Sequence, residues 1–195
     1  SGAVIGALRA QAAFELGLRE SIPIVAGAAD QAALLVASGV IDPGRGSITL
    51  GTGGQITVVS SRPMIDPKLR LNTFCHAAPD RWYTMGAILN AGIALRWWRL
   101  MVSEGRKSYP ELLAEADHAP AGSEGLIFLP YLEGARTPHM DPDATGAFVG
   151  LTLRHSPAHM TRAVLEGVAF AFRDCLLTLR EAGPVPDLFL VGGGG

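Results

Sequence analysis

The sequence has 195 residues, of which 48% are hydrophobic and 17% charged, a composition that is typical of a folded globular chain and excludes intrinsic disorder. Its 16 Lys and Arg residues against 18 Asp and Glu residues give a net charge of -2, which predicts neither nucleic-acid binding nor attachment to an anionic membrane. No apolar run reaches the roughly 18 residues of a membrane-spanning helix. Cys75 and Cys175 are too few for a disulfide framework and are interpreted as free thiols of a reducing compartment.

Strands and helices alternate along the chain, which predicts an α/β fold. The expected strands are residues 22–26, 47–50, 55–60, 72–77, 82–86, 126–129 and 188–191. The expected helices are residues 3–18, 31–38, 89–103, 110–117 and 156–181. Apolar spacings of three and four predict the first helix, and a Ser-Pro pair predicts the start of the last. The turn-forming cluster at 42–46 is the expected boundary between two lobes, residues 1–42 and 43–195.

The turn Gly51-Thr52-Gly53, between two predicted strands, is the first candidate site. Successive glycines let backbone N–H groups converge on an anion, and the Thr52 hydroxyl adds a donor. An ordinary Gly-rich hairpin turn is the alternative interpretation.

Asp30 follows a predicted strand and begins a predicted helix. An acidic residue is common there as a helix N-cap, worth about 1 kcal/mol. The alternative is a catalytic base, because α/β sheets bind ligands at the carboxyl ends of their strands and a carboxylate can accept a proton from a substrate hydroxyl.

Glycines 192–195 follow the last predicted strand. A strand that ends in glycines can pack closely against a purine and its ribose, but the same composition is also typical of a linker. Both ends of the sequence look cut, so we expect an excerpt of a longer protein.

Metal-binding patterns are weak in this sequence. The stretch that begins at Asp141 resembles the start of an EF-hand loop, but Thr152 stands where that loop needs Glu. The five histidines show no zinc-site spacing. We therefore expect no metal held directly by side chains.

The order of these features resembles the FGGY family of carbohydrate kinases: an Asp at a strand–helix junction, a Gly-Thr-Gly turn about twenty residues later, and a final strand with glycines. A longer pattern is more specific, because residues 146–151 and, after seven residues, 159–166 fit the family's C-terminal signature at every constrained position. The resemblance covers essentially the whole chain. It implies the ribonuclease H-like α/β lobes of the actin, hexokinase and Hsp70-like ATPases, present here as a partial chain.

The resemblance also implies roles for single residues. Asp30 accepts the proton of the attacking hydroxyl, and Gln31 contacts the polyol. The nucleotide is bound by the turn, by the start of a later helix and by the last strand; the residues implied are Gly51, Thr52, Gly53, Gly92, Gly193 and Gly194. ATP is the implied phosphoryl donor, with Mg²⁺ bridging its phosphates.

Within the family, residues 74–77, 81–82, 85–86 and 94–98 are most similar to the members that phosphorylate D-xylulose to D-xylulose 5-phosphate. A gluconate, glycerol or other polyol kinase, and a non-catalytic ATP-binding relative, are the alternatives. The family's first phosphate hairpin, of Asp-x-Gly-Thr type, is absent from these 195 residues, so we expect this piece alone to be inactive. The implied partner is a small sugar in the cytoplasm, without nucleic acid or membrane, and a homodimer is compatible with the resemblance.

Overall fold

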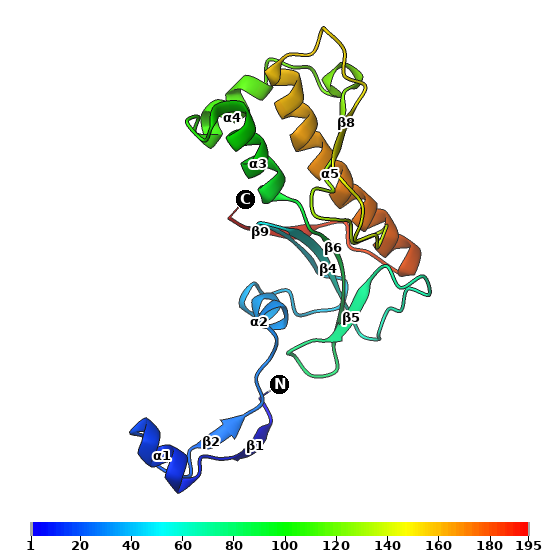
Figure 1. Ribbon diagram of the computed structural model, residues 1–195. Coiled ribbons are helices and arrows are strands. Elements are labelled where there is room, and N and C mark those ends of the chain that lie inside the picture. The colour runs from blue at the N-terminus through cyan, green and yellow to red at the C-terminus, as the bar shows by residue number, and fades with distance from the viewer. Residues whose placement is uncertain (1, 195) are drawn as a thin grey trace.

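The computed structural model describes residues 2–194, and a five-stranded mixed sheet lies at its centre (Figure 1). Its strands follow the order β5-β6-β4-β3-β9, antiparallel throughout except for the parallel pair β3 and β9. These strands are β3 (Gly46–Leu50), β4 (Gly54–Ser60), β5 (Asn72–Cys75), β6 (Trp82–Ile88) and β9 (Phe189–Gly193). The helices that cover the sheet or extend from it are α2 (Asp30–Ala37), α3 (Gly92–Ser103), α4 (Tyr109–Ala116) and α5 (Pro157–Ala182).

Helices α2 and α5 cover opposite faces of this sheet. Leu35 of α2 packs with Val59 and Tyr83, whereas Leu179 of α5 packs with Val58. Because neighbouring residues of a strand point to opposite faces, Val58 and Val59 of β4 assign the two helices to different sides. Each face of the sheet therefore has its own core.

A second core extends beyond the sheet, between α3, α4 and the first half of α5. It also contains the short antiparallel strands β7 (Ile127–Leu129) and β8 (Ala147–Val149). Trp97 stacks on Phe128 with ring centroids 5.9 Å apart, and the Trp98 indole N–H donates a 2.8 Å hydrogen bond to Thr161 Oγ1. The Trp97-Trp98 pair thus packs in this second core.

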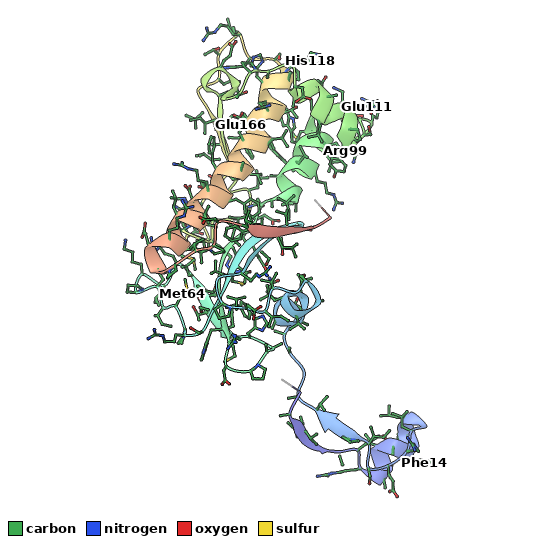
Figure 2. All side chains as sticks on the ribbon, turned by 180° about the vertical axis from the view of Figure 1, so that it is seen from behind. Phe14, Met64, Arg99, Glu111, His118 and Glu166 are labelled. Carbon is green, nitrogen blue, oxygen red and sulfur yellow. The ribbon has the colours of Figure 1, made fainter. Side chains whose placement is uncertain are left out.

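The N-terminal segment projects away from the rest of the molecule, and Phe14 lies near its far end (Figure 2). Here the prediction of one helix over 3–18 is wrong. The chain forms β1 (Val4–Ala7), then α1 (Ala10–Leu16), then β2 (Pro23–Val25), with β1 antiparallel to β2. The pairing partner of β1 lies about twenty residues downstream, which local periodicity does not reveal.

Most other predicted elements are confirmed within one to three residues. The sequence missed β8, and β9 continues into Gly192 and Gly193 rather than ending before them. Residue 195, the last of the predicted terminal glycines, lies outside the described residues. In the described part of the chain, no helix combines the length and apolar character needed to cross a membrane.

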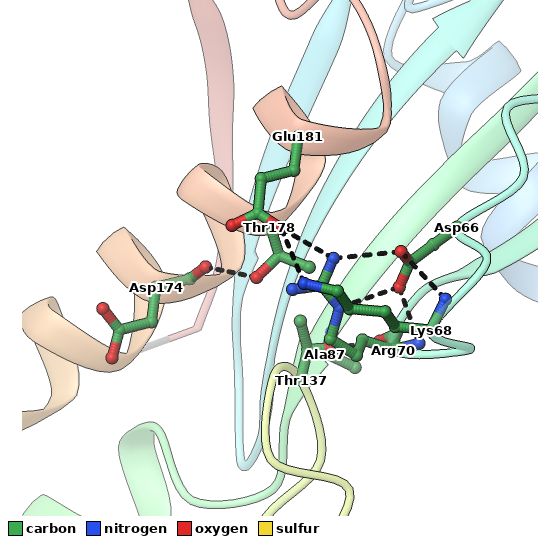
Figure 3. Close-up of polar contacts among 8 residues, drawn as sticks. All are labelled: Asp66, Lys68, Arg70, Ala87, Thr137, Asp174, Thr178 and Glu181. Atoms are coloured by element: carbon green, nitrogen blue, oxygen red, sulfur yellow. Dashed lines mark hydrogen bonds and ion pairs between the residues drawn. The ribbon is translucent and has the colours of Figure 1, made fainter.

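A network of ion pairs connects the loop before β5 to the C-terminal end of α5 (Figure 3). The Arg70 guanidinium donates to both carboxylate oxygens of Asp66, at 2.9 and 3.0 Å, and to Glu181 Oε2 at 2.8 Å. The hydrogen bonds from Arg70 lower the pKa of the buried Asp66 to about 2. These ion pairs make the network a structural brace of the sheet.

Candidate active site

The turn between β3 and β4 is bonded to the start of α3 through the backbone. The amides of Ala91 and Ile93 both donate to the Thr52 carbonyl at 3.1 Å, and the Gly92 amide donates to the Gly51 carbonyl at 2.9 Å. These bonds hold the turn against the N-terminus of a twelve-residue helix, the end at which a helix attracts anions.

Two of the predicted glycines are required by this close approach. A Cβ on Gly53 would lie 2.8 Å from the Ile88 carbonyl oxygen, and a Cβ on Gly92 would lie 2.6 Å from the Gly51 carbonyl oxygen. Both distances are shorter than a methyl group tolerates. No hydrogen bond leads from the amides of Thr52 or Gly53 to any residue among 2–194, so these two N–H groups are free donors. Free backbone donors in a turn are suited to bind an anion.

The last strand ends beside this turn. In the parallel pair of β3 and β9, Leu50 is opposite Gly193. Gly193 has φ of 122°, and a Cβ there would lie 2.0 Å from the Leu50 carbonyl oxygen, so only glycine fits. Gly193 and the turn are therefore at the same edge of the sheet.

A cavity of about 940 Å³ begins at this edge, on the α5 face of the sheet. Four of the predicted nucleotide-binding residues line it: Gly51, Thr52, Gly92 and Gly194. Gly53 and Gly193 are not among the lining residues but are bonded neighbours of them. The remaining wall is mainly apolar side chains from β3, α3, α4, α5 and β9, and it also includes Arg96 of α3 and Tyr109 of α4. The volume lies in the range of small-molecule sites.

Asp30 and Gln31 do not line this cavity. They begin α2, on the opposite face of the sheet, where the Gln31 side-chain amide donates to Thr57 Oγ1 at 3.3 Å. The exposed Asp30 carboxylate accepts a 2.7 Å bond from the Gln31 backbone N–H, and Ala29 rather than Asp30 is the N-cap. Burial, and then the Asp30 charge, raise the pKa of the Tyr83 phenol.

The distance between the two groups of residues follows from the strand that they share. Thr57 stands three positions after Gly54, the first residue of β4, and each position of a strand spans about 3.3 Å. The contact of α2 with β4 is therefore about 10 Å from the glycine turn. Gln31 therefore contacts the face of the sheet opposite the cavity, three residues along β4 from the start of that strand.

Sequence reasoning missed several polar groups around the turn. Arg96 follows Gly92 by four residues, which on a helix is the same face, so the spacing could have signalled it. Asn90 is 2% exposed and neither polar atom of its amide has a hydrogen-bond partner, and the buried Gln55 Oε1 also lacks one. No motif distinguishes these two.

Within residues 2–194 there is no cluster of three or more His, Cys, Asp or Glu side chains that could hold a metal ion. The free amides of the turn, next to an open cavity, fit phosphate oxygens. An ion carried by the phosphates themselves would need no such cluster.

Comparison with known proteins places this geometry in a family. The profile of the FGGY family of carbohydrate kinases, C-terminal domain, matches residues 46–195. The xylulose kinase of Escherichia coli (strain K12) is 39% identical over 192 residues, covering 98% of this chain and 39% of that protein. The gluconokinase of Bacillus subtilis (strain 168) is 37% identical over 193 residues, covering 93% of this chain and 37% of that protein. The crystal structure of xylulose kinase from Rhodospirillum rubrum superposes with a TM-score of 0.87 at 36% identity, over 98% of this chain and 38% of that one.

Proposed function

The chain belongs to the FGGY family of carbohydrate kinases, and from this premise we propose that its protein transfers the γ-phosphoryl group of ATP to a sugar hydroxyl, with D-xylulose as substrate. The chain spans 39% of the length of the E. coli relative, and the activity is proposed for the full-length protein. The observation that carries the proposal is the turn at 51–53, whose free amides border a cavity large enough for a nucleotide. The names of the similar kinases support the sugar.

In the proposed complex the glycine turn binds the phosphates. The free amides of Thr52 and Gly53, with the Thr52 hydroxyl, donate to β- and γ-phosphate oxygens, and Gly51 leaves them room. Gly92 brings the positive end of α3 toward the same oxygens. Gly193 and Gly194 lie against the adenosine. Mg²⁺, bound with ATP, supplies charge neutralisation on the phosphates.

Asp30 is the proposed general base. The substrate oxygen attacks the γ-phosphorus, the bond from that phosphorus to the bridging oxygen breaks, ADP leaves, and the hydroxyl proton passes to the Asp30 carboxylate. Gln31 contacts the polyol with its side-chain amide. Asp30 and Gln31 lie on the α2 face of the sheet and the cavity beside the turn lies on its α5 face, and in the proposed complex the sugar and the γ-phosphate meet at the sheet edge.

We further propose that residues 1–42 belong to a sugar-binding lobe and residues 43–195 to a nucleotide-binding lobe. Closure of these lobes excludes water that would otherwise accept the phosphoryl group. The cytoplasm is the proposed location, because it supplies ATP and keeps thiols such as Cys75 and Cys175 reduced.

Gluconate is the second candidate substrate, favoured by the 37% identity to the B. subtilis gluconokinase. A non-catalytic nucleotide-binding protein is a third reading, which would not need Asp30. Coupled measurement of ADP release by the full-length protein, with D-xylulose, gluconate and glycerol in turn, separates these readings. Faster ADP release with gluconate than with D-xylulose would make gluconate the substrate. No ADP release with any of the three polyols, in a protein that binds ATP, would reject the kinase function.

Substitution of the proposed base tests the mechanism. Asp30→Asn keeps the shape but not the basicity, so kcat is expected to fall by about a hundredfold or more while ADP affinity is unchanged. Asp187→Asn, in an exposed loop, is the matched control and keeps wild-type kcat. An Asp30→Asn enzyme with wild-type turnover would reject Asp30 as the base.

A further inference from the structure

Tyr109 forms part of the cavity wall opposite the sheet. It is the first residue of α4, lines the cavity and is 40% exposed. Most of the other wall residues are aliphatic, among them Leu113 on the same helix and Leu165 on α5. An exposed aromatic ring in a mostly aliphatic cavity offers a flat surface to a planar ligand.

The backbone at this ring is fixed by a complete helix cap. The Ser108 amide donates a 2.7 Å bond to Glu111 Oε2, and Ser108 Oγ accepts from the Glu111 amide, so a capping box closes the start of α4 directly at Tyr109. Figure 2 labels Glu111 on α4 and Arg99 on the neighbouring α3.

Arg99 holds the ring itself. Its guanidinium carbon lies 4.9 Å from the centroid of the Tyr109 ring, a cation–π contact. The same guanidinium donates to the carbonyl oxygens of Lys107 and Gly105, the second at 2.6 Å, so it is itself immobilised. One face of the ring is covered in this way, while Tyr109 still lines the cavity.

The distance from the phosphate turn to this ring suits a nucleotide. Gly92 contacts the turn, and Arg99 follows it by seven residues on the same helix. At 1.5 Å per residue, the separation along α3 is about 10 Å. A ribose and its phosphates in an extended conformation bridge such a gap.

Resting on the proposed function, we infer that Tyr109 is the residue that stacks against the adenine base of ATP. The ring contributes affinity for the base and takes no part in phosphoryl transfer. Arg99 is its positioning residue, because it holds the ring from behind without lining the cavity.

The inference is tested on the full-length protein with three nucleotide probes. ADP carries base and phosphates, tripolyphosphate carries no base, and etheno-ADP reports stacking because its fluorescence is quenched against an aromatic ring. Tyr109→Leu preserves apolar bulk without an aromatic face, Tyr109→Phe preserves the face, and Phe170→Ala is the control for loss of an exposed aromatic side chain outside the cavity.

Tyr109→Leu is expected to weaken ADP binding about tenfold or more, from the usual contribution of base–aromatic stacking, while tripolyphosphate binds as before. Quenching of bound etheno-ADP disappears in this variant and remains in Tyr109→Phe and Phe170→Ala. Unchanged ADP affinity in Tyr109→Leu, or an equal loss for ADP and tripolyphosphate, would overturn the inference.

The outcome is separable from that of the proposed function. If the wild-type enzyme phosphorylates a sugar and Tyr109→Leu binds ADP with unchanged affinity, only the stacking role of Tyr109 is rejected. If the wild-type protein phosphorylates no sugar, but Tyr109→Leu weakens binding of ADP and not of tripolyphosphate, only the kinase function is rejected.

Discussion

The contact between Gly92 and the phosphate turn leads to a sharp prediction for Gly92→Ala. The added Cβ would lie 2.6 Å from the Gly51 carbonyl oxygen, which also accepts the Gly92 amide at 2.9 Å. The turn must therefore move away from α3. That movement weakens the neighbouring bonds from Ala91 and Ile93 to the Thr52 carbonyl, both 3.1 Å long.

The magnitude is the difference between two opposing effects. Overpacking at backbone costs about 1–3 kcal/mol, and weakening of hydrogen bonds adds about 1 kcal/mol. Replacing Gly by Ala inside a helix returns up to about 1 kcal/mol. We expect a net loss of about 2 kcal/mol in the free energy of unfolding. Loss of one amide-to-phosphate hydrogen bond, about 1.4 kcal/mol, corresponds to tenfold weaker ADP binding.

Urea unfolding and calorimetric ADP titration of the full-length protein measure both quantities. The matched control is Gly192→Ala, because nothing lies within 4 Å of a Cβ at that position and its φ is not in the left-handed region. The control should keep wild-type stability. If Gly92→Ala instead gained stability and bound ADP normally, the contact with the turn would not constrain this position.

Three further predictions concern stability and thiol chemistry. Gly193→Ala places a Cβ 2.0 Å from a carbonyl oxygen at φ 122°, so we expect a loss of more than about 2 kcal/mol by urea unfolding, against none for Gly192→Ala; equal values would contradict the geometry. Asp66→Asn removes a carboxylate whose pKa is lowered from 3.8 to about 2 in the folded protein. The carboxylate contributes about 1–2 kcal/mol to the free energy of unfolding, which is present above pH 3.8 and is lost as the pH falls through 2. The variant should therefore be less stable than wild type at pH 7 and equally stable near pH 2, as measured by urea unfolding. Burial raises the pKa of the Cys175 thiol to about 12, so at pH 8 peptide mapping of the native protein should find Cys75 alkylated and Cys175 not; prompt labelling of both would show that the core opens.

The elements that the sequence predicts well carry their own local signals. The Ser156-Pro157 pair marks the start of α5, and the glycine turn marks the hairpin of β3 and β4. Strand β1 carries none: every residue of Val4–Ala7 is exposed, so no buried face imposes a period of two. Strand β8 has three residues and depends on its pairing with β7, a contact between segments about twenty residues apart.

The candidate site was predictable to a similar extent. The glycines and Asp30 are visible as motifs, but the cavity wall is not, because Tyr109 joins it only through the packing of α4 beside α3 and α5. The position of α2 was also hidden. Its contact through Gln31 with Thr57 joins residues 26 apart, and only the alternation of β4 shows which face it covers.

The glycines of this site have a structural role that does not depend on a bound nucleotide. Gly53, Gly92 and Gly193 each lie against a backbone carbonyl that would clash with a Cβ at 2.8, 2.6 and 2.0 Å, so the fold needs them even when no nucleotide is bound. A Gly-rich pattern therefore predicts close backbone packing first and phosphate binding second. Phosphate binding depends instead on the donors that this packing leaves unpaired, the amides of Thr52 and Gly53 beside the cavity. Because those two groups have no acceptor within residues 2–194, a bound phosphate would satisfy donors that the fold leaves free.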